Sequence, residues 1–216
     1  MNVLIDKDIV DFLKTIYFGD YSDPIKAAGS RAYRDMNRTI RFHSVDKAGR
    51  KRLRKEVDSI FEEEIKKANL RDMKSQEEFD SWHYSVCTRI KNVYRKAGIQ
   101  LTYGQAQKWL NMTIKYLYML EANTFEDIFG WLHVPLDNYV FNIAGDELGV
   151  KRPKKAWSKW DDYRGEYFAY QKQLREKICY EPLRWEFHYW LKEIQKNKYG
   201  IGSRNRELSD QDSSVG

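Results

Sequence analysis

The chain contains little cysteine, proline or glycine. Its 216 residues include 2 Cys, 4 Pro and 12 Gly. Cys87 and Cys179 are too few for a disulfide framework or a four-thiolate iron–sulfur cluster, and neither has a Cys or His partner at metal-ligand spacing. The scarcity of Pro and Gly is typical of a helical protein with short loops. The sequence therefore predicts no cofactor and no bound metal.

Long apolar runs are also missing. No stretch comes near the roughly 18 consecutive apolar residues of a membrane span, and Asp6, Lys7 and Asp8 stand where a signal peptide needs an apolar run. The sequence therefore predicts a soluble, cytoplasmic protein without a membrane partner. Its composition is 42% hydrophobic and 15% aromatic, far more than a disordered chain has, so we expect it to fold by itself.

Charge is unevenly distributed along the chain. The net charge is +6, from 38 Lys and Arg against 32 Asp and Glu. Residues 26–55 hold 11 basic and 2 acidic residues, or +9, which leaves 27 basic and 30 acidic residues, or −3, for the remainder. A localised basic block favours an anionic partner, and nucleic acid is the usual one.

Helix signals dominate. Apolar periodicity and capping residues predict helices over residues 6–16, 22–42, 47–69, 75–97, 102–122, 124–129, 135–144, 161–178 and 182–197. Because no run alternates as a strand would, we expect an all-α fold, with two helical lobes around a cleft. One domain is expected over residues 1–200, with its central part at about 22–144. The polar residues 201–216 contain no aromatic side chain and predict a disordered tail.

Arginines line one face of the helix expected over residues 22–42. At 100° per residue they fall on one arc of about 80°. They are Arg31, Arg34, Arg38 and Arg41. The guanidinium fork matches phosphate, so this face is a candidate for binding nucleic acid. The alternative is a solvated face that pairs with acidic helices.

A second basic segment, residues 151–160, interleaves five basic residues with two tryptophans. Lys154 and Lys155 are candidates for phosphate contacts, and Trp157 for stacking on a base or sugar. The alternative is that the tryptophans are core anchors at the start of a helix.

The helix expected from residue 102 carries a narrow polar stripe. It is apolar almost all round, yet Lys108, Asn111 and Lys115 share an arc of about 60°. Two ammonium groups on a buried helix are costly unless they reach solvent, a carboxylate or a cleft. Asp137 provides a carboxylate, so we expect Lys108 to face it across the cleft, with Asn111 and Lys115 beside them. Snorkelling of the lysines, and a helix-dipole role for Asp137, are the alternatives.

These residues carry a resemblance to a known family. Gly104-x-x-x-Lys108-x-x-Asn111, followed by the segment 134–141 with Asp137, resembles the helix-hairpin-helix DNA glycosylases of the endonuclease III type and their archaeal 8-oxoguanine glycosylase branch. The resemblance covers residues 101–144. The chain departs from the family pattern in its single hairpin glycine, in the residues that follow Asp137, and in the 29-residue interval from Lys108 to Asp137.

The resemblance implies excision of a damaged base from double-stranded DNA, with or without a later AP lyase step. The base is flipped into a pocket, Lys108 attacks the sugar C1′ to form a Schiff base, and Asp137 stabilises the developing positive charge. Candidates for the substrate pocket are Tyr103, Asn111, Lys115, Trp131 and His133.

Two other interpretations stay open. Arg38 and His43 match the Arg-x4-6-His mark of HEPN-type RNases, a pattern that any basic helix with a His can match. A non-catalytic helical protein that binds nucleic acid or a protein partner would need none of this chemistry. A Lys108 that faces Asp137 favours the enzyme, whereas a Lys108 in bulk solvent favours the binding protein. The sequence does not indicate an oligomeric state.

Overall fold

The computed structural model describes residues 6–43, 45–67 and 70–195, which form helices and loops and no strand. The predicted all-α class is confirmed. The α-helices are α1 (Lys7–Phe18), α2 (Pro24–Met36), α3 (Lys47–Phe61), α4 (Gln76–Lys96), α5 (Tyr103–Met119), α6 (Asn138–Leu148) and α7 (Ala169–Lys177), and residues 182–195 are also helical. The predicted tail, 201–216, lies outside the described residues.

Short helical turns complete the fold. Four are 3₁₀ helices: Asn37–Thr39, Leu70–Asp72, Glu126–Trp131 and Trp157–Lys159. Two are π-helices, Glu62–Lys67 after α3 and Tyr163–Phe168 before α7. Within the described ranges, no helix combines the length and the apolar character needed to cross a membrane.

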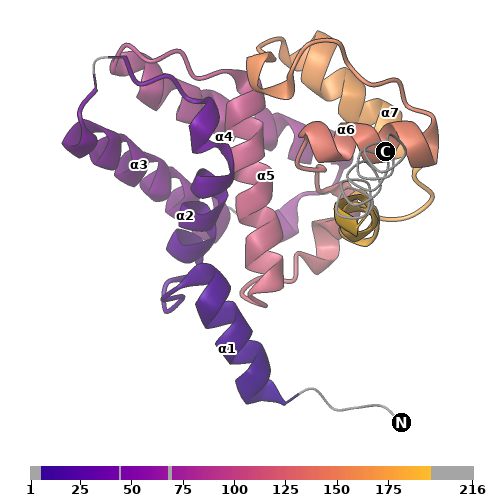
Figure 1. Cartoon of the computed structure of the whole chain (residues 1–216), viewed down its shortest axis with the longest axis horizontal. Coiled ribbons are helices and arrows are strands. Elements are labelled where there is room, and N and C mark those ends of the chain that lie inside the picture. Colours follow the sequence, from indigo (N-terminus) through magenta and orange to yellow (C-terminus); the bar gives the residue numbers. More distant parts are fainter. Residues whose placement is uncertain (1–5, 44, 68–69, 196–216) are drawn as a thin grey trace, which may run out of the picture.

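Helix α5 runs through the centre of the molecule. Helices α2 and α3 lie on one side of it and α6 and α7 on the other (Figure 1), and α4 packs against both α3 and α5. Every residue from Tyr103 to Leu117 is buried, and α2 makes the most extensive packing with α5. A helix that is apolar on nearly all sides is stable only in the interior, so the composition of α5 dictates its position.

The start of α5 is fixed from two directions. Thr102 and Gln105 form the predicted capping box, with each side chain bonded to the other residue's backbone N–H. Gly104 allows close approach of the segment 157–160, because a Cβ at this position would lie 1.8 Å from the carbonyl oxygen of Trp157. The glycine of the apparent family motif therefore has a packing role in this chain.

Several predicted boundaries were wrong: α6, for example, continues to Leu148, past the predicted end at residue 144. Two of the errors concern candidate site residues. Helix α2 ends at Met36 rather than near residue 42, because the Thr39 hydroxyl donates to the Met36 carbonyl and Ile40 turns into the core. Arg38 and Arg41 consequently lie beyond α2. Helix α6 begins at Asn138 rather than at Pro135, because the Asp137 side chain accepts from the N–H of Val140 and acts as the N-cap.

Candidate functional site

Lys108 and Asp137 meet between α5 and the segment that precedes α6. The distance between Lys108 Nζ and Asp137 Oδ2 is 2.6 Å, and Lys108 Nζ also lies 3.4 Å from the carbonyl oxygen of Pro135. The Lys108 side chain is 7% exposed, whereas the Asp137 side chain is 16% exposed. The structure thus brings the two residues together in a largely enclosed position. Because Asp137 Oδ1 caps α6, one carboxylate serves both contacts.

The second lysine of the stripe has a carboxylate of its own. Lys115 Nζ lies 2.5 Å from Glu186 Oε2, and the Glu186 residue is 2% exposed. The same ammonium group lies 4.4 Å from the centre of the Phe187 ring, a cation–π contact. Lys115 therefore forms an ion pair with the helix of residues 182–195. The two lysines do not share one carboxylate, because Lys108 pairs with Asp137 and Lys115 pairs with Glu186. Glu186 was not among the residues predicted from the sequence.

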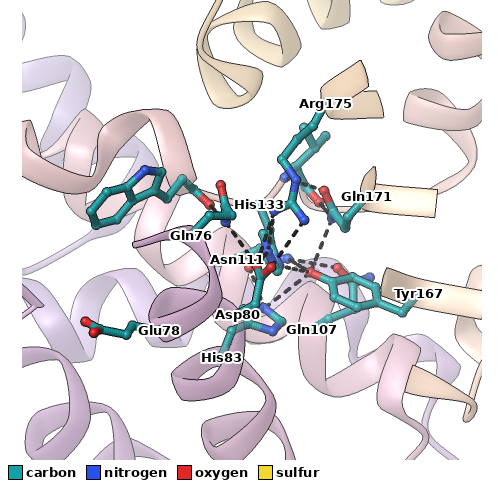
Figure 2. A network of polar contacts seen from close by, with 12 residues as sticks. Gln76, Glu78, Asp80, His83, Gln107, Asn111, His133, Tyr167, Gln171 and Arg175 are labelled. Atoms are coloured by element: carbon teal, nitrogen blue, oxygen red, sulfur yellow. Dashed lines mark hydrogen bonds and ion pairs between the residues drawn. The ribbon is translucent and has the colours of Figure 1, made fainter. Parts of the chain in front are cut away.

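Asn111, between the two lysines, belongs to a buried polar network (Figure 2). Its amide donates to Tyr167 Oη at 2.9 Å and to Gln107 Oε1 at 3.0 Å, and its carbonyl oxygen lies 2.9 Å from His83 Nε2. Gln107 in turn donates to the carbonyl of Leu136 at 3.0 Å. The polar stripe of α5 is therefore bonded along its length to the C-terminal half of the chain.

Two histidines hold the network together. His83 Nδ1 lies 3.0 Å from the Tyr103 hydroxyl and accepts a hydrogen bond from it, because Nε2 donates to the Asn111 carbonyl oxygen, which can only accept. His133 Nδ1 lies 2.7 Å from the Tyr167 hydroxyl and His133 Nε2 lies 2.6 Å from Asp80 Oδ1. Each ring has one donor contact and one acceptor contact, which is the pattern of a neutral imidazole.

The electrostatics agree with this assignment. Burial lowers the pKa of His83 well below its usual value, and burial also lowers the pKa of His133 despite the hydrogen bond to Asp80. Burial acts to raise the pKa of Asp80, but the hydrogen bond from His133 and the charge of Arg175 outweigh it, so that pKa is lowered. Arg175 and Asp80, 3.2 Å apart, are then the charged pair of the network. We interpret the network as a satisfied, rigid interior.

The residues expected to line a base pocket are distributed differently. Tyr103, Asn111 and His133 are buried in the network and meet through His83 and Tyr167. Of the three, Tyr103 also contributes to the wall of a hollow beside the start of α5. Trp131 is half-buried, and its carbonyl accepts from Gln76 at 3.1 Å.

Most residues of the network were not among the site residues predicted from the sequence. The sequence does contain a signal for these residues, namely polar side chains at helical spacing on otherwise apolar helix faces. Two of them are three residues apart on α4, and the others are four residues apart, just before α7 and along it. They are Asp80, His83, Tyr167, Gln171 and Arg175.

A hollow of ≈930 Å³ lies beside the start of α5. Tyr84 and Tyr163 stand in its wall with ring centres 4.6 Å apart, and Arg95 and Arg164 also line it. The first amides of α5 already have acceptors: the N–H of Tyr103 donates to Asp161 Oδ1 and the N–H of Gly104 to the carbonyl of Trp160, each at 2.8 Å. These amides therefore have no free hydrogen for a phosphate of DNA.

The expected arginine face divides into two parts. Arg31 bonds inside the molecule, to Asp35 at 2.7 Å and to the Tyr17 hydroxyl at 3.1 Å. The remaining arginines of the expected face are exposed. Two arginines of α3 lie against aromatic rings of the same part of the chain, Arg50 over Phe42 and Arg54 over Tyr33. Among the described residues these five have no ion-pair partner. We call them the basic surface: Arg34, Arg38, Arg41, Arg50 and Arg54.

The tryptophans of residues 151–160 are core residues. Trp157 is 8% exposed and Trp160 is 3% exposed. Stacking of Trp157 on a base would require it to leave the core, so its burial favours the alternative of a core anchor. Lys154 is exposed, and Lys155 is paired with Glu166 at 2.5 Å.

The two residues of the HEPN-type match do not share a helix. Arg38 lies in the 3₁₀ turn after α2 and His43 lies in the loop that follows, and both are exposed.

Comparison of the chain with protein-family models, with curated proteins and with solved structures found no match. In the part of the chain that the structure describes, no group of three or more His, Cys, Asp or Glu side chains is placed to hold a metal ion. Inference about function therefore rests on the residues and their geometry.

Proposed function

We propose that this protein is a divergent base-excision DNA glycosylase of the helix-hairpin-helix type, with Lys108 as its nucleophile. The observation that supports this most directly is the 2.6 Å contact between Lys108 Nζ and Asp137 Oδ2. These are the two positions that match the catalytic lysine and aspartate of the family that the sequence resembles. A lysine in bulk solvent would have favoured the binding protein instead.

The chemistry requires a proton to leave Lys108 first. Asp137 accepts that proton, and the free amine attacks C1′ of the flipped nucleotide as the bond from C1′ to the base breaks with its electron pair on the base. The base takes up the proton held by Asp137 and leaves, which restores the Asp137 carboxylate. That carboxylate stabilises the positive charge of the Lys108–C1′ adduct. The sugar ring then opens as a proton moves from the Lys108 nitrogen to O4′, which gives a protonated Schiff base between Lys108 and C1′.

The exposure of the pair indicates the direction of approach. Asp137 is the more exposed member, so the nucleotide would enter from its side of the pair. DNA would be held mainly by the basic surface through phosphate, because those guanidinium groups have no carboxylate partner among the described residues. Hairpin amides would contribute little, since those of Tyr103 and Gly104 are occupied.

A non-catalytic nucleic-acid-binding protein is the second candidate. Its specific support is the double contact of each member of the pair: Asp137 also caps α6, and Lys108 also lies near the Pro135 carbonyl. These contacts give the pair a sufficient structural role, joining α5 to α6. In this candidate the basic surface binds nucleic acid and Lys108 takes no part in chemistry.

Borohydride trapping on oligonucleotides that carry different lesions separates the two candidates. Lys108→Arg keeps a cation beside Asp137 but cannot form a Schiff base, and Lys115→Arg is the matched control on the same helix. We expect the wild type and Lys115→Arg to form covalent adducts, and Lys108→Arg to bind DNA with unchanged affinity and to form none. Failure of the wild type to trap on any lesion, with DNA binding intact, would establish the second candidate.

A further inference from the structure

Helix α1 projects away from the rest of the molecule (Figure 1) and carries an exposed apolar stripe. Ile9 is 55% exposed, Phe12 63%, Leu13 59% and Ile16 66%. We call these four residues the α1 stripe. Phe18 is the one residue of α1 that is buried. Side chains of this size are mostly buried in monomeric proteins, so the stripe requires an explanation.

The orientation of α1 is fixed at its C-terminal half. The hydroxyl groups of Tyr17 and Tyr116 are 3.0 Å apart, the Phe18 ring packs edge-on against Tyr116, and Lys14 Nζ lies 2.6 Å from Glu121 Oε2. These contacts hold one face of α1 to the body, so the opposite face is directed outward. A helix of 12 residues is marginal in water on its own, which makes a covering partner valuable to it.

We infer that the α1 stripe is a dimer interface, in which α1 pairs in antiparallel orientation with α1 of a second copy of this chain. At about 100° per residue, Ile9 and Ile16 occupy the middle of the stripe, with Phe12 on one edge and Leu13 on the other. A two-fold axis between residues 12 and 13 therefore places Phe12 and Leu13 each against its own counterpart. The same axis places Ile9 against Ile16 of the other copy. A two-fold interface requires such self-complementarity.

Charge also favours a second copy over a lipid surface or an acidic partner. The stripe contains no charged residue, and its flanks carry Asp8, Thr15 and Tyr17 but no cation. A helix that binds an anionic membrane needs Lys or Arg along those flanks. Antiparallel pairing places the positive end of each helix dipole beside the negative end of the other, which is favourable.

The size of the stripe predicts a weak dimer. Four large side chains that are each more than half exposed present on the order of 400 Å² per chain, so two copies bury about 800 Å² through the stripe alone. That area is below the roughly 1,200 Å² of a standard stable interface. We therefore expect an equilibrium between monomer and dimer that shifts with protein concentration.

Sedimentation velocity over a wide concentration range tests the dimer. The wild-type mass should rise from one chain toward two, and Phe12→Asp/Leu13→Asp should remain a monomer throughout. Leu191→Asp is the matched control, because Leu191 is 60% exposed on the helix of residues 182–195 and should leave association unchanged. A wild type that is monomeric at every concentration overturns the inference, as does a double variant that associates like the wild type.

Cysteine cross-linking tests the orientation. The exposed Cys179 is first replaced by Ser, while Cys87 is buried. Phe12→Cys or Leu13→Cys should then form a disulfide-linked dimer, and Ile9→Cys should link only when mixed with Ile16→Cys. Self-linking at residue 9 would indicate a parallel pair and contradict the proposal. Monomeric protein that co-floats with anionic phospholipid vesicles would likewise overturn it, in favour of a lipid surface.

Discussion

The polar stripe of α5 and the basic surface, which extends over α2, α3 and the segment between them, both contain cationic side chains but in opposite environments. Inside, Lys108 and Lys115 each contact one carboxylate, at 2.6 and 2.5 Å. Outside, the arginines of the basic surface form no ion pair within 4 Å among the described residues. A buried cation requires a carboxylate within the fold to compensate its charge, whereas the charge of an exposed cation is compensated by solvent or by a binding partner. Helical spacing in the sequence did not distinguish the buried, paired lysines from the exposed arginines.

Breaking one buried pair should have the largest effect on folding. Lys115→Met leaves Glu186 as an unpaired buried carboxylate, which should lower the free energy of unfolding by about 3–5 kcal/mol. Lys115→Met/Glu186→Leu should recover most of that loss. Arg34→Met is the surface control and should change it by less than about 0.5 kcal/mol. Urea denaturation measures all three, and equal effects at positions 115 and 34 would refute the contrast.

Gly104→Ala tests how tightly the interior site is packed. The added Cβ would lie 1.8 Å from the Trp157 carbonyl oxygen, so the segment 157–160 must move off α5. We expect a loss of about 3 kcal/mol, at the upper end of overpacking effects. Gly130→Ala is the control, because its Cβ would meet nothing within 4 Å. Thermal melts that show the same small change for both variants would contradict this packing role.

The buried histidines should make the interior acid-sensitive. Their pKa values are lowered in the folded protein, so below about pH 6.5 the unfolded chain takes up protons that the folded chain does not. Stability is therefore full above pH 6.5 and falls as the pH decreases, by up to about 1.4 kcal/mol per His and pH unit. His83→Gln should flatten this slope even if it lowers stability overall. An unchanged slope would assign the acid sensitivity to other groups.

Asp58 should show the opposite dependence. Burial raises its pKa to about 6, and Oδ1 has no hydrogen-bond partner among the described residues. Because the folded pKa exceeds the unfolded value, this carboxyl destabilises the protein increasingly as the pH rises from about 4 to 6. Asp58→Asn should therefore add on the order of 1 kcal/mol at pH 7, after allowance for solvent screening, and nothing near pH 4. Measuring the unfolding free energy of His83→Gln and Asp58→Asn over one pH series separates the pH dependence of the histidines from that of Asp58.

Charge reversal on the basic surface should have the smallest effect on folding. Arg34→Glu/Arg38→Glu should shift the unfolding free energy by no more than about 0.5 kcal/mol. Affinity for duplexes of any sequence should fall, and the difference from wild type should shrink as salt is added. Lys172→Glu/Lys177→Glu, on exposed positions of α7, is the control. Equal losses in both variants would indicate a diffuse charge effect and no defined surface.

Local signals in the sequence predicted local structure well. The caps at Ser75 and Thr102 fixed the starts of α4 and α5 because a side-chain oxygen can reach only a nearby backbone N–H. The burial of α5 was also predictable, because a helix that is apolar on nearly all sides is stable only in the interior. The narrow polar stripe then required a carboxylate, and Asp137 provides one for Lys108.

Features that depend on distant segments were not predictable in this way. Glu186 meets Lys115 from 71 residues away, and His133 meets Asp80 across 53 residues, so neither pairing leaves a periodic signal. The end of α2 depended on a single Thr39 hydroxyl and on where Ile40 could be buried. Trp157 could equally have stacked on a base or anchored the core until its neighbours on α5 were known.

Mapping the covalent adduct by mass spectrometry after borohydride trapping tests the central claim most directly. The trapped protein is digested, and the peptide that carries the reduced sugar is identified. The account predicts that the adduct lies on Lys108, and that Lys115 in the same helix remains unmodified. An adduct on the N-terminal amine or on another lysine, with Lys108 unmodified, would contradict the assignment of Lys108 as the nucleophile.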